Sequence, residues 1–137
     1  MALTTYATTD VVTASRDEQL TSVLGMMDDH HVGSVIVVED DEPIGIVSDR
    51  KIAMHLRDAD SIEGATVEEC MTENPVTVDE STTHFEVLER MADEGIRRIP
   101  ITEDGSLTGI ITLDDLLTVT AAELSNIADV VEKQSGG

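Results

Sequence analysis

Apolar residues recur with the period of a helix in one stretch of the chain, and the same pattern returns 64 positions later. In both stretches the spacing i, i+3, i+4, i+7 places these positions on one face of an amphipathic helix. The two sets are Leu20, Val23, Leu24 and Met27, and then His84, Val87, Leu88 and Met91. Two short apolar runs with an acidic turn between them follow each predicted helix, which indicates β-hairpins. The expected hairpin strands are 35–38 with 44–47 and 99–102 with 108–111.

The second half of the chain repeats the first half without a gap, with about ten identical positions over roughly 40 residues. Val12-Thr13 falls on Val76-Thr77, and Gly45-Ile46 falls on Gly109-Ile110. A gapless duplication predicts two copies of one β-α-β-β-α unit in an α/β (α+β) fold. Since a copy of about 45–50 residues is at the lower edge of what folds alone, we expect the copies to share one hydrophobic core.

The pattern also predicts the boundaries of the elements. Residues 1–137 are expected to form a single module with repeats at 7–57 and 71–122, a linker at 58–70, and a helical extension with a frayed tail at 123–137. Each repeat should open with an extended segment, at 11–14 and 75–78, and close with a second helix, at 49–56 and 113–124, the latter continuing to about residue 132. Ser15 with Glu18 has the spacing of a capping box, and Asp79 is the expected cap in the second copy.

Composition excludes several classes of function. The chain has 137 residues, of which 40% are hydrophobic, so it is globular rather than disordered. Its apolar runs are too short to cross a membrane, and a basic-then-apolar leader is missing, which favours a cytoplasmic protein. The single cysteine, Cys70, matches no zinc spacing and forms no disulfide within the chain.

The charge is strongly acidic, with a net charge of −21 and a pI near 4.1. Such a surface repels nucleic acids and anionic membranes. Only Lys51 and Lys133 of the eight basic residues are lysines, a balance typical of proteins from salt-accumulating halophiles. At molar salt the Debye length is about 3 Å, which screens this self-repulsion. An ordinary acidic cytosolic protein is the alternative.

The ordered motifs resemble those of a known family. Each copy ends in Gly, two apolar residues, Ser or Thr, two further residues, and in the second copy Asp. Together with segments 10–13, 31–35 and 45–50, and with 70–78, 96–101 and 109–115, this set resembles a pair of cystathionine-β-synthase (CBS) domains, a Bateman module, from about Tyr6 to Thr120.

The resemblance implies a function as well as a fold. It implies two sheets packed face to face with pseudo-twofold symmetry, which leaves two clefts between the repeats for AMP, ADP, ATP or S-adenosylmethionine. It further implies a flat homodimer that regulates an attached or partner protein, with no catalysis and no required cofactor. The sequence agrees in showing no Ser/His/Asp or Cys/His constellation and no Walker loop.

Thr112 and Asp115 are the first candidate ligand-binding residues. The resemblance implies that Asp115 binds the ribose hydroxyls and that Thr112 binds ribose or phosphate. A carboxylate can accept two hydrogen bonds from a cis-diol, and a helix N-terminus favours phosphate. The alternative is a capping box at the start of the last helix, and the two roles are compatible.

The first copy departs from this pattern in Ser48-Asp49-Arg50-Lys51, because Lys51 replaces the aspartate and cannot accept hydrogen bonds from a diol. Three alternatives remain: an empty site, Asp49 as a substitute, or a more anionic ligand with Lys51 on its phosphate. Asp49 is disfavoured because it should point from another face of the helix. We therefore expect unequal clefts, with the Asp115 cleft the conventional one.

Five of the eight basic residues lie in or beside the cleft motifs, where they would attract an anionic ligand. They are Arg50, Lys51, Arg57, Arg97 and Arg98. Local ion pairs with the abundant carboxylates are the alternative. Arg98, directly before a buried strand, is the strongest candidate.

The resemblance also implies positions near the adenine base or the cleft. These are Thr13, Thr77, Val78, Ile99, Pro100 and Gly109. For the two threonines, an ordinary place on a pleated strand is the alternative. His30-His31 has no third metal ligand nearby, so we interpret it as favourable charge at a helix end. Two functions follow: a regulatory module that senses adenine nucleotides or a related adenosyl ligand, or an adaptor of the same fold with degenerate clefts.

Overall fold

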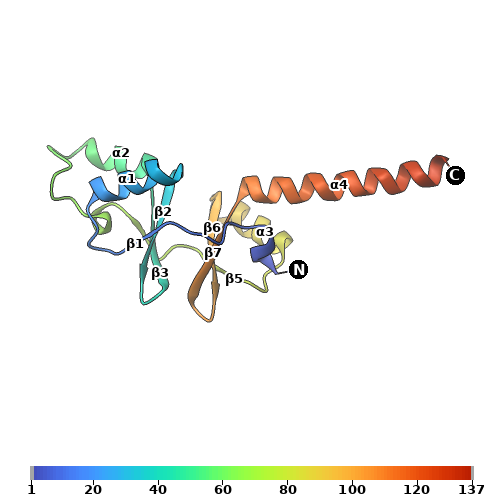
Figure 1. Ribbon diagram of the computed structural model, residues 1–137, viewed down its shortest axis with the longest axis horizontal. Coiled ribbons are helices and arrows are strands. Elements are labelled where there is room, and N and C mark those ends of the chain that lie inside the picture. Colours follow the sequence, from blue (N-terminus) through green and yellow to red (C-terminus); the bar gives the residue numbers. More distant parts are fainter. Residues whose placement is uncertain (1, 137) are drawn as a thin grey trace.

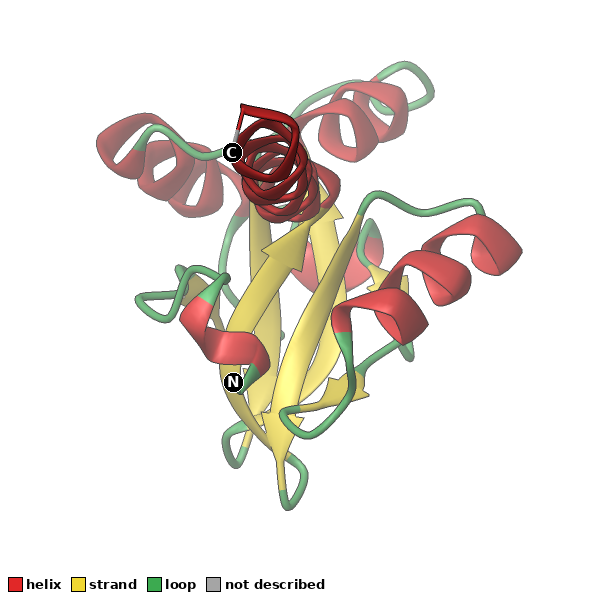
Figure 2. Cartoon of the chain, turned by 90° about the vertical axis from the view of Figure 1, so that its right-hand side faces the viewer, coloured by secondary structure: helices red, strands yellow, loops and turns green. Residues whose placement is uncertain are grey.

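The computed structural model describes residues 2–136, which form two similar halves joined side by side and one long helix that extends away from the second half (Figure 1). The first half contains β1 (Thr13–Ala14), α1 (Leu20–His30), β2 (Ser34–Glu39), β3 (Glu42–Ser48) and α2 (Asp49–Leu56). The second contains β5 (Val78–Asp79), α3 (His84–Glu94), β6 (Arg98–Glu103), β7 (Ser106–Thr112) and α4 (Leu113–Gly136). The predicted fold class, two β-α-β-β-α units, is confirmed. Figure 2 looks along α4 and shows helices lying around the strands.

Each half has its own sheet, built around the predicted hairpin. β2 pairs antiparallel with β3 and parallel with β1, and in the same way β6 pairs with β7 and β5. Both hairpin turns need two residues with positive φ. Asp104 and Gly105 supply them at 51° and 85°, while Asp40 and Asp41 adopt 51° and 65°. The first copy therefore makes the same turn without the glycine.

The two halves exchange their leading segments. β4 (Thr72–Glu73), just ahead of the second repeat, pairs with β3 of the first sheet. Thr8 makes the equivalent antiparallel bridge to Ile110 of β7, in which the Thr8 and Ile110 N–H groups donate to each other's carbonyls at 3.1 and 2.9 Å. The N-terminal segment thus begins against the second half and crosses to the first, as Figure 1 shows.

The hydrophobic interior consists of two separate clusters rather than the single shared core that we expected. The first lies under α1 and α2, and the second under α3 and the start of α4. The exchange of leading segments places Leu3, of the 3-10 turn η1 (Leu3–Thr5), in the second cluster. In the same way it places Val67 and Cys70 in the first cluster. Val67 begins another 3-10 turn, η2 (Val67–Glu69), so the segment expected as a linker contributes to the interior of the first half. Each cluster is therefore completed by residues from the segment that leads into the other repeat.

Three expected helix ends differ from the structure. α1 begins at Leu20 after Gln19 without a side-chain cap, and Ser15 instead donates to Asp17. α3 is capped by Thr83, whose hydroxyl accepts from the Glu86 N–H, whereas Asp79 accepts from Ser81. The expected frayed tail at 134–137 is helical as far as Gly136, and Gly137 lies outside the described residues.

Candidate functional site

Two clefts lie between the halves, each lined by residues of both. The Ser48 cleft has a volume of about 430 Å³ and is lined by Ile46, Ser48, Asp49, Arg50, Lys51, Thr72, Ile96, Arg97 and Arg98. The Thr112 cleft has a volume of about 370 Å³ and is lined by Thr8, Asp10, Val11, Val12, His31, Val32, Gly33, Ser34, Ile36, Arg98, Ile110, Thr112 and Asp114. Both volumes fall in the range of small-molecule sites, about 300–1,000 Å³.

The two clefts are related by the 64-residue duplication, which places Ile46, Ser48 and Thr72 where Ile110, Thr112 and Thr8 lie in the other. Their apolar surface comes from the sheet faces turned away from the two clusters. Ile36 is an example. Its neighbours Val35 and Val37 face the first cluster, so Ile36 points to the other side of the sheet, where it lines the Thr112 cleft and is 1% exposed.

A helix N-terminus opens onto each cleft, and the two are capped differently. At α4, Asp115 Oδ2 accepts from the Thr112 N–H at 2.9 Å, and the Asp115 N–H donates to Thr112 Oγ1 at 3.2 Å. This is the complete capping box. At α2, Ser48 Oγ accepts from the Lys51 N–H at 3.0 Å, and lysine cannot return the second bond.

The capping box turns the Asp115 carboxylate back toward its own helix. Asp114, and not Asp115, lines the Thr112 cleft. Asp49 lines the Ser48 cleft although sequence reasoning disfavoured it, and its carboxylate accepts from the Arg50 N–H at 2.7 Å. The carboxylate at the Thr112 cleft therefore comes one position before the motif aspartate, and that at the Ser48 cleft comes two positions before Lys51, which replaces it.

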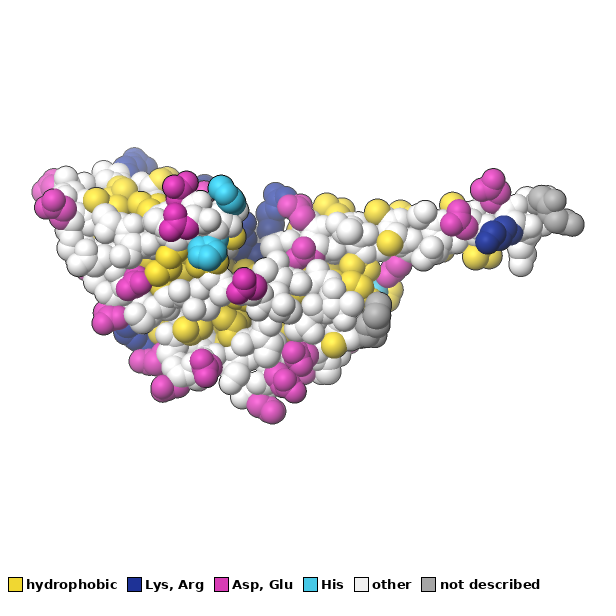
Figure 3. Space-filling model, in the orientation of Figure 1, with side chains coloured by type: hydrophobic (Ala, Val, Ile, Leu, Met, Phe, Trp, Pro, Cys, Tyr) yellow, Lys and Arg dark blue, Asp and Glu magenta, His cyan; other side chains and the backbone are white. Residues whose placement is uncertain are grey.

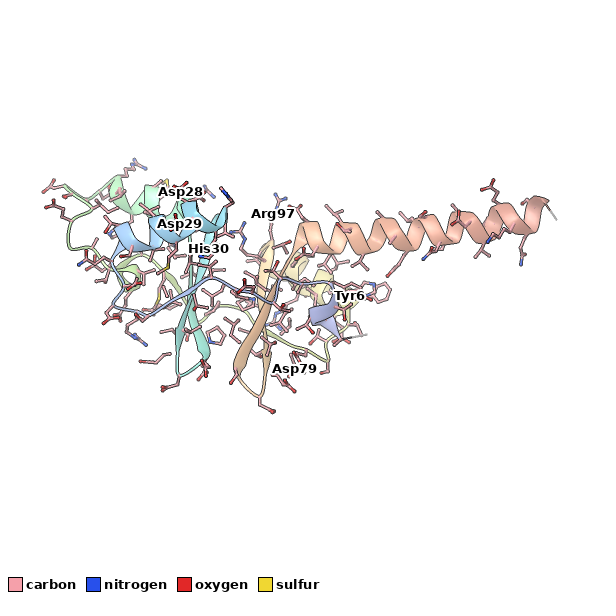
Figure 4. All side chains as sticks on the ribbon, viewed as in Figure 1. Tyr6, Asp28, Asp29, His30, Asp79 and Arg97 are labelled. Carbon is pink, nitrogen blue, oxygen red and sulfur yellow. The ribbon has the colours of Figure 1, made fainter. Side chains whose placement is uncertain are left out.

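The charges of the two clefts differ sharply. Arg50, Lys51, Arg97 and Arg98 line the Ser48 cleft against one carboxylate, that of Asp49. The Thr112 cleft has Asp10 and Asp114 with one arginine, Arg98. Half of the basic residues in a chain of net charge −21 thus gather at one cleft. Figure 3 shows dark blue side chains in the notch between the halves, and Figure 4 shows Arg97 there, across from His30.

In the described part of the chain, no carboxylate oxygen lies within ion-pair distance of the four cations of the Ser48 cleft. Within residues 2–136, the arginines with a carboxylate oxygen within 4.0 Å are Arg16 and Arg90, both outside the clefts. Local pairing, the alternative reading of the cleft arginines, is therefore absent from the described part of the chain. Arg57 lies past the end of α2 and lines neither cleft.

Arg98 lines both clefts, and Arg97 lies with it around a smaller pocket that also contains Thr112 and Asp114. Arg98 begins β6, directly opposite Thr112 of β7. The duplication gives its counterpart in the first copy as Ser34, which lines the Thr112 cleft, so the shared arginine has no twin.

Of the positions expected near the base, Pro100 lies at a cleft. It lines a pocket continuous with the Ser48 cleft, together with Asn74, Pro75 and Val76. Ile99 is fully buried in the second cluster, Val78 packs against that cluster, and Thr13 and Thr77 lie beside the residues that line the clefts. Strand alternation could have shown that Arg98 and Pro100 share a face opposite to Ile99.

Gly109 has a packing role. A Cβ at this position would lie 3.1 Å from the Thr8 carbonyl oxygen, which is held in the bridge to Ile110. The duplicated Gly45 faces the Met71 side chain in the same way. The exchanged segment therefore leaves little room for a side chain at either glycine, with backbone as the obstacle at Gly109 and a side chain at Gly45.

The remaining candidates stay outside the clefts' chemistry. No group of three or more metal-ligating side chains occurs among residues 2–136. His31 ends α1 in a left-handed conformation and lines the Thr112 cleft without a metal-ligating partner group among these residues. Burial raises the pKa of the Cys70 thiol. None of the helices in the described chain is long and apolar enough to span a membrane.

The sequence of the chain matches a known domain family. The family model of the CBS domain matches the chain twice, over residues 3–58 and 67–122. The chain belongs to the CBS domain family. The predicted CBS pair is thereby confirmed, and the clefts between its repeats are the candidate site.

Relatives of this CBS pair include an uncharacterized protein and a segment of an enzyme. An uncharacterized protein of Methanopyrus kandleri is 34% identical over 127 residues, which cover 90% of this chain and 65% of that protein. Inosine-5′-monophosphate dehydrogenase of Halobacterium salinarum is 34% identical over 110 residues, 79% of this chain and 21% of the enzyme. The chain spans 65% and 62% of the first two curated relatives that it matches.

A solved structure has the same fold. The CBS domain pair of protein MJ0100, in complex with 5′-methylthioadenosine and S-adenosyl-L-methionine, has a TM-score of 0.78 and covers 90% of this chain and 98% of its own. Its sequence identity is 21%, so the likeness concerns the fold alone.

Proposed function

We propose that this CBS pair is a regulatory module that binds an adenine nucleotide or a related adenosyl ligand between its repeats and signals to a partner protein. The observation that carries the proposal is the pair of clefts, each with a capped helix N-terminus and a mixed apolar and charged lining. Relatives support it: a structural neighbour holds two adenosyl ligands, and a related segment is part of a dehydrogenase.

The clefts have different ligand preferences in this proposal. The Ser48 cleft takes the more anionic ligand, because four cations surround the α2 N-terminus, and phosphate oxygens are good acceptors for them. Lys51 then contacts phosphate in place of the family's carboxylate. The Thr112 cleft takes ribose hydroxyls, with the Asp114 carboxylate as the acceptor that lines it; Asp115, the family's ribose ligand, could join only by giving up its bond to the Thr112 N–H.

Signalling requires a ligand that binds two states of the protein with different affinity. Because Arg98 borders both clefts, a ligand that draws its guanidinium into one cleft changes the charge of the other. The proposal includes the homodimer and the cytoplasmic, halophilic setting that the acidic, lysine-poor composition favours. It assigns no catalytic step to the module.

A second candidate is an adaptor that binds no nucleotide. Lys51 favours it, because the lysine replaces the carboxylate that would hold a ribose at the first motif. In that case the fold serves as a protein-binding or dimerisation surface.

Thermal melting at high salt separates the two candidates. AMP, ADP, ATP and S-adenosylmethionine are added in turn, and a ligand at 100 times its dissociation constant should add about 2.7 kcal/mol to the free energy of unfolding. Titration calorimetry with the active ligand should then show two unequal sites or a single one. The absence of a shift with all four ligands favours the adaptor, and two identical strong sites refute the unequal clefts.

A further inference from the structure

The distal part of α4 has an uncovered apolar face. Near the body, Leu116 is buried in the second cluster and Leu113 packs against it. Every residue from Leu124 to Ser135 is exposed, including Leu124, Ile127 and Val131 at 59–61%. Figure 1 shows this part of α4 projecting beyond both halves, and Figure 3 shows yellow side chains along it.

The exposed apolar residues follow a heptad. Leu117, Leu124 and Val131 are seven residues apart and take position a, and Ile127 takes position d, which the polar, half-buried Thr120 occupies one heptad earlier. Ala121 and Ala128 lie beside this line at position e, where small side chains let another helix approach closely. We call the line from Leu117 to Val131 the α4 seam. A 3.5-residue repeat of this kind is typical of a helix that pairs with another helix.

The charges of α4 lie away from the seam. Asp129, Glu132 and Lys133 occupy positions f, b and c of the heptad, on the opposite face. Glu123 flanks the seam, and its Oε1 lies 2.9 Å from Nε2 of His84 in the body. Two identical seams therefore meet without like charges facing each other, which is unusual on a chain of net charge −21.

The projecting helix needs a partner for its own stability. Its distal part, from Thr120 to Ser135, makes no contribution to either cluster. Isolated helices of about 12–15 residues are marginal in water. The exposed apolar side chains are Leu117, Leu124, Ile127 and Val131 of the seam, with Val130 at the flanking position g. At roughly 80–100 Å² each, these five would hide roughly 800–1,000 Å² in a symmetric pair, near the lower bound of about 1,000 Å² for a specific interface. Such a pair is concentration-dependent rather than permanent.

We propose that the α4 seam pairs with the α4 seam of a second copy of this chain and forms a two-helix coiled coil. This inference identifies the interface of the proposed homodimer, and it rests on that homodimer but not on the ligand. Salt should strengthen the pair, because it screens the repulsion between two acidic bodies and favours apolar burial. An interface built on ion pairs would show the opposite dependence.

Sedimentation velocity on the full chain at about 100 μM in 2 M KCl tests the pairing. We expect a dimer that dissociates on dilution and at low salt. Ile127→Glu should give a monomer, since it places a charge in the centre of the seam. Ser125→Glu adds the same charge at position b of the same helix and should leave the dimer intact. Circular dichroism checks that both variants keep their helix.

A disulfide test identifies the contact directly. Ile127→Cys, in a Cys70→Ala background, should cross-link two copies under mild oxidation, and Ser125→Cys should cross-link far less. A wild-type monomer at this concentration, or a dimer that survives Ile127→Glu, overturns the inference. A wild-type monomer would mean that the seam binds a different protein. A dimer that survives Ile127→Glu would mean that the two CBS repeats, and not α4, form the dimer interface. Ligand-induced thermal shifts of Ile127→Glu test the proposed function separately.

Discussion

Replacing Arg97 by glutamine should weaken nucleotide binding without unfolding the protein. Arg97 lines the Ser48 cleft, is exposed and has no carboxylate within ion-pair distance among the described residues. Its removal therefore leaves no buried partner unsatisfied. An exposed substitution of this kind changes the free energy of unfolding by about 0.5 kcal/mol or less.

The expected loss of affinity follows from the position of the side chain. A hydrogen bond to a charged group contributes about 1.5–3 kcal/mol, whereas an exposed ion pair contributes about 0.2–1 kcal/mol. Arg97 is exposed at the cleft, so we expect a value between these ranges, about 1–1.4 kcal/mol. That is a loss of about fivefold to tenfold in ATP affinity at 0.1 M salt. Adding Lys51→Gln should lower the affinity further by a similar factor.

Titration calorimetry with ATP and with uncharged 5′-methylthioadenosine measures the effect. Arg57→Gln is the matched control, because it removes the same charge from a residue outside both clefts. We expect ATP affinity to fall for Arg97→Gln and to change little for Arg57→Gln. The difference in affinity between the two variants should be smaller at 1 M salt, where screening is strong. Equal losses for both variants, or an equal loss for 5′-methylthioadenosine, would refute a phosphate contact at Arg97.

Two further predictions concern stability and reactivity. Gly109→Ala should destabilise the protein by about 2 kcal/mol because its Cβ meets the backbone of Thr8, whereas Gly45→Ala should cost less because the flexible Met71 side chain can move. Urea unfolding measures both, and the reverse order would contradict the packing argument. Burial raises the pKa of Cys70, so its reactive thiolate is scarcer in the folded protein than in a free cysteine at the same pH. Labelling by a thiol reagent at pH 8 should be slow and should accelerate with higher pH or with denaturant; immediate labelling in the native state would count against a buried thiol.

Local signals in the sequence determined the elements and their duplication. The helix α2 was predicted at its observed bounds, and both hairpins lie where the apolar runs and acidic turns indicated. These features depend on neighbouring residues alone: hydrophobic period, turn residues and the cap at Ser48. The capping box of Thr112 and Asp115 was likewise readable from its spacing.

Tertiary structure decided which residues face the clefts. Side chains alternate along a strand, so an error of one position moves a residue from cleft to interior, as for Ile99 beside Pro100. The exchange of leading segments depends on pairing between residues about one hundred positions apart, such as Thr8 with Ile110, which no local pattern encodes. The same packing makes Arg98 common to both clefts and gathers four cations at one. The sequence thus determined the repeated scaffold, and the contact between its copies determined the unequal clefts.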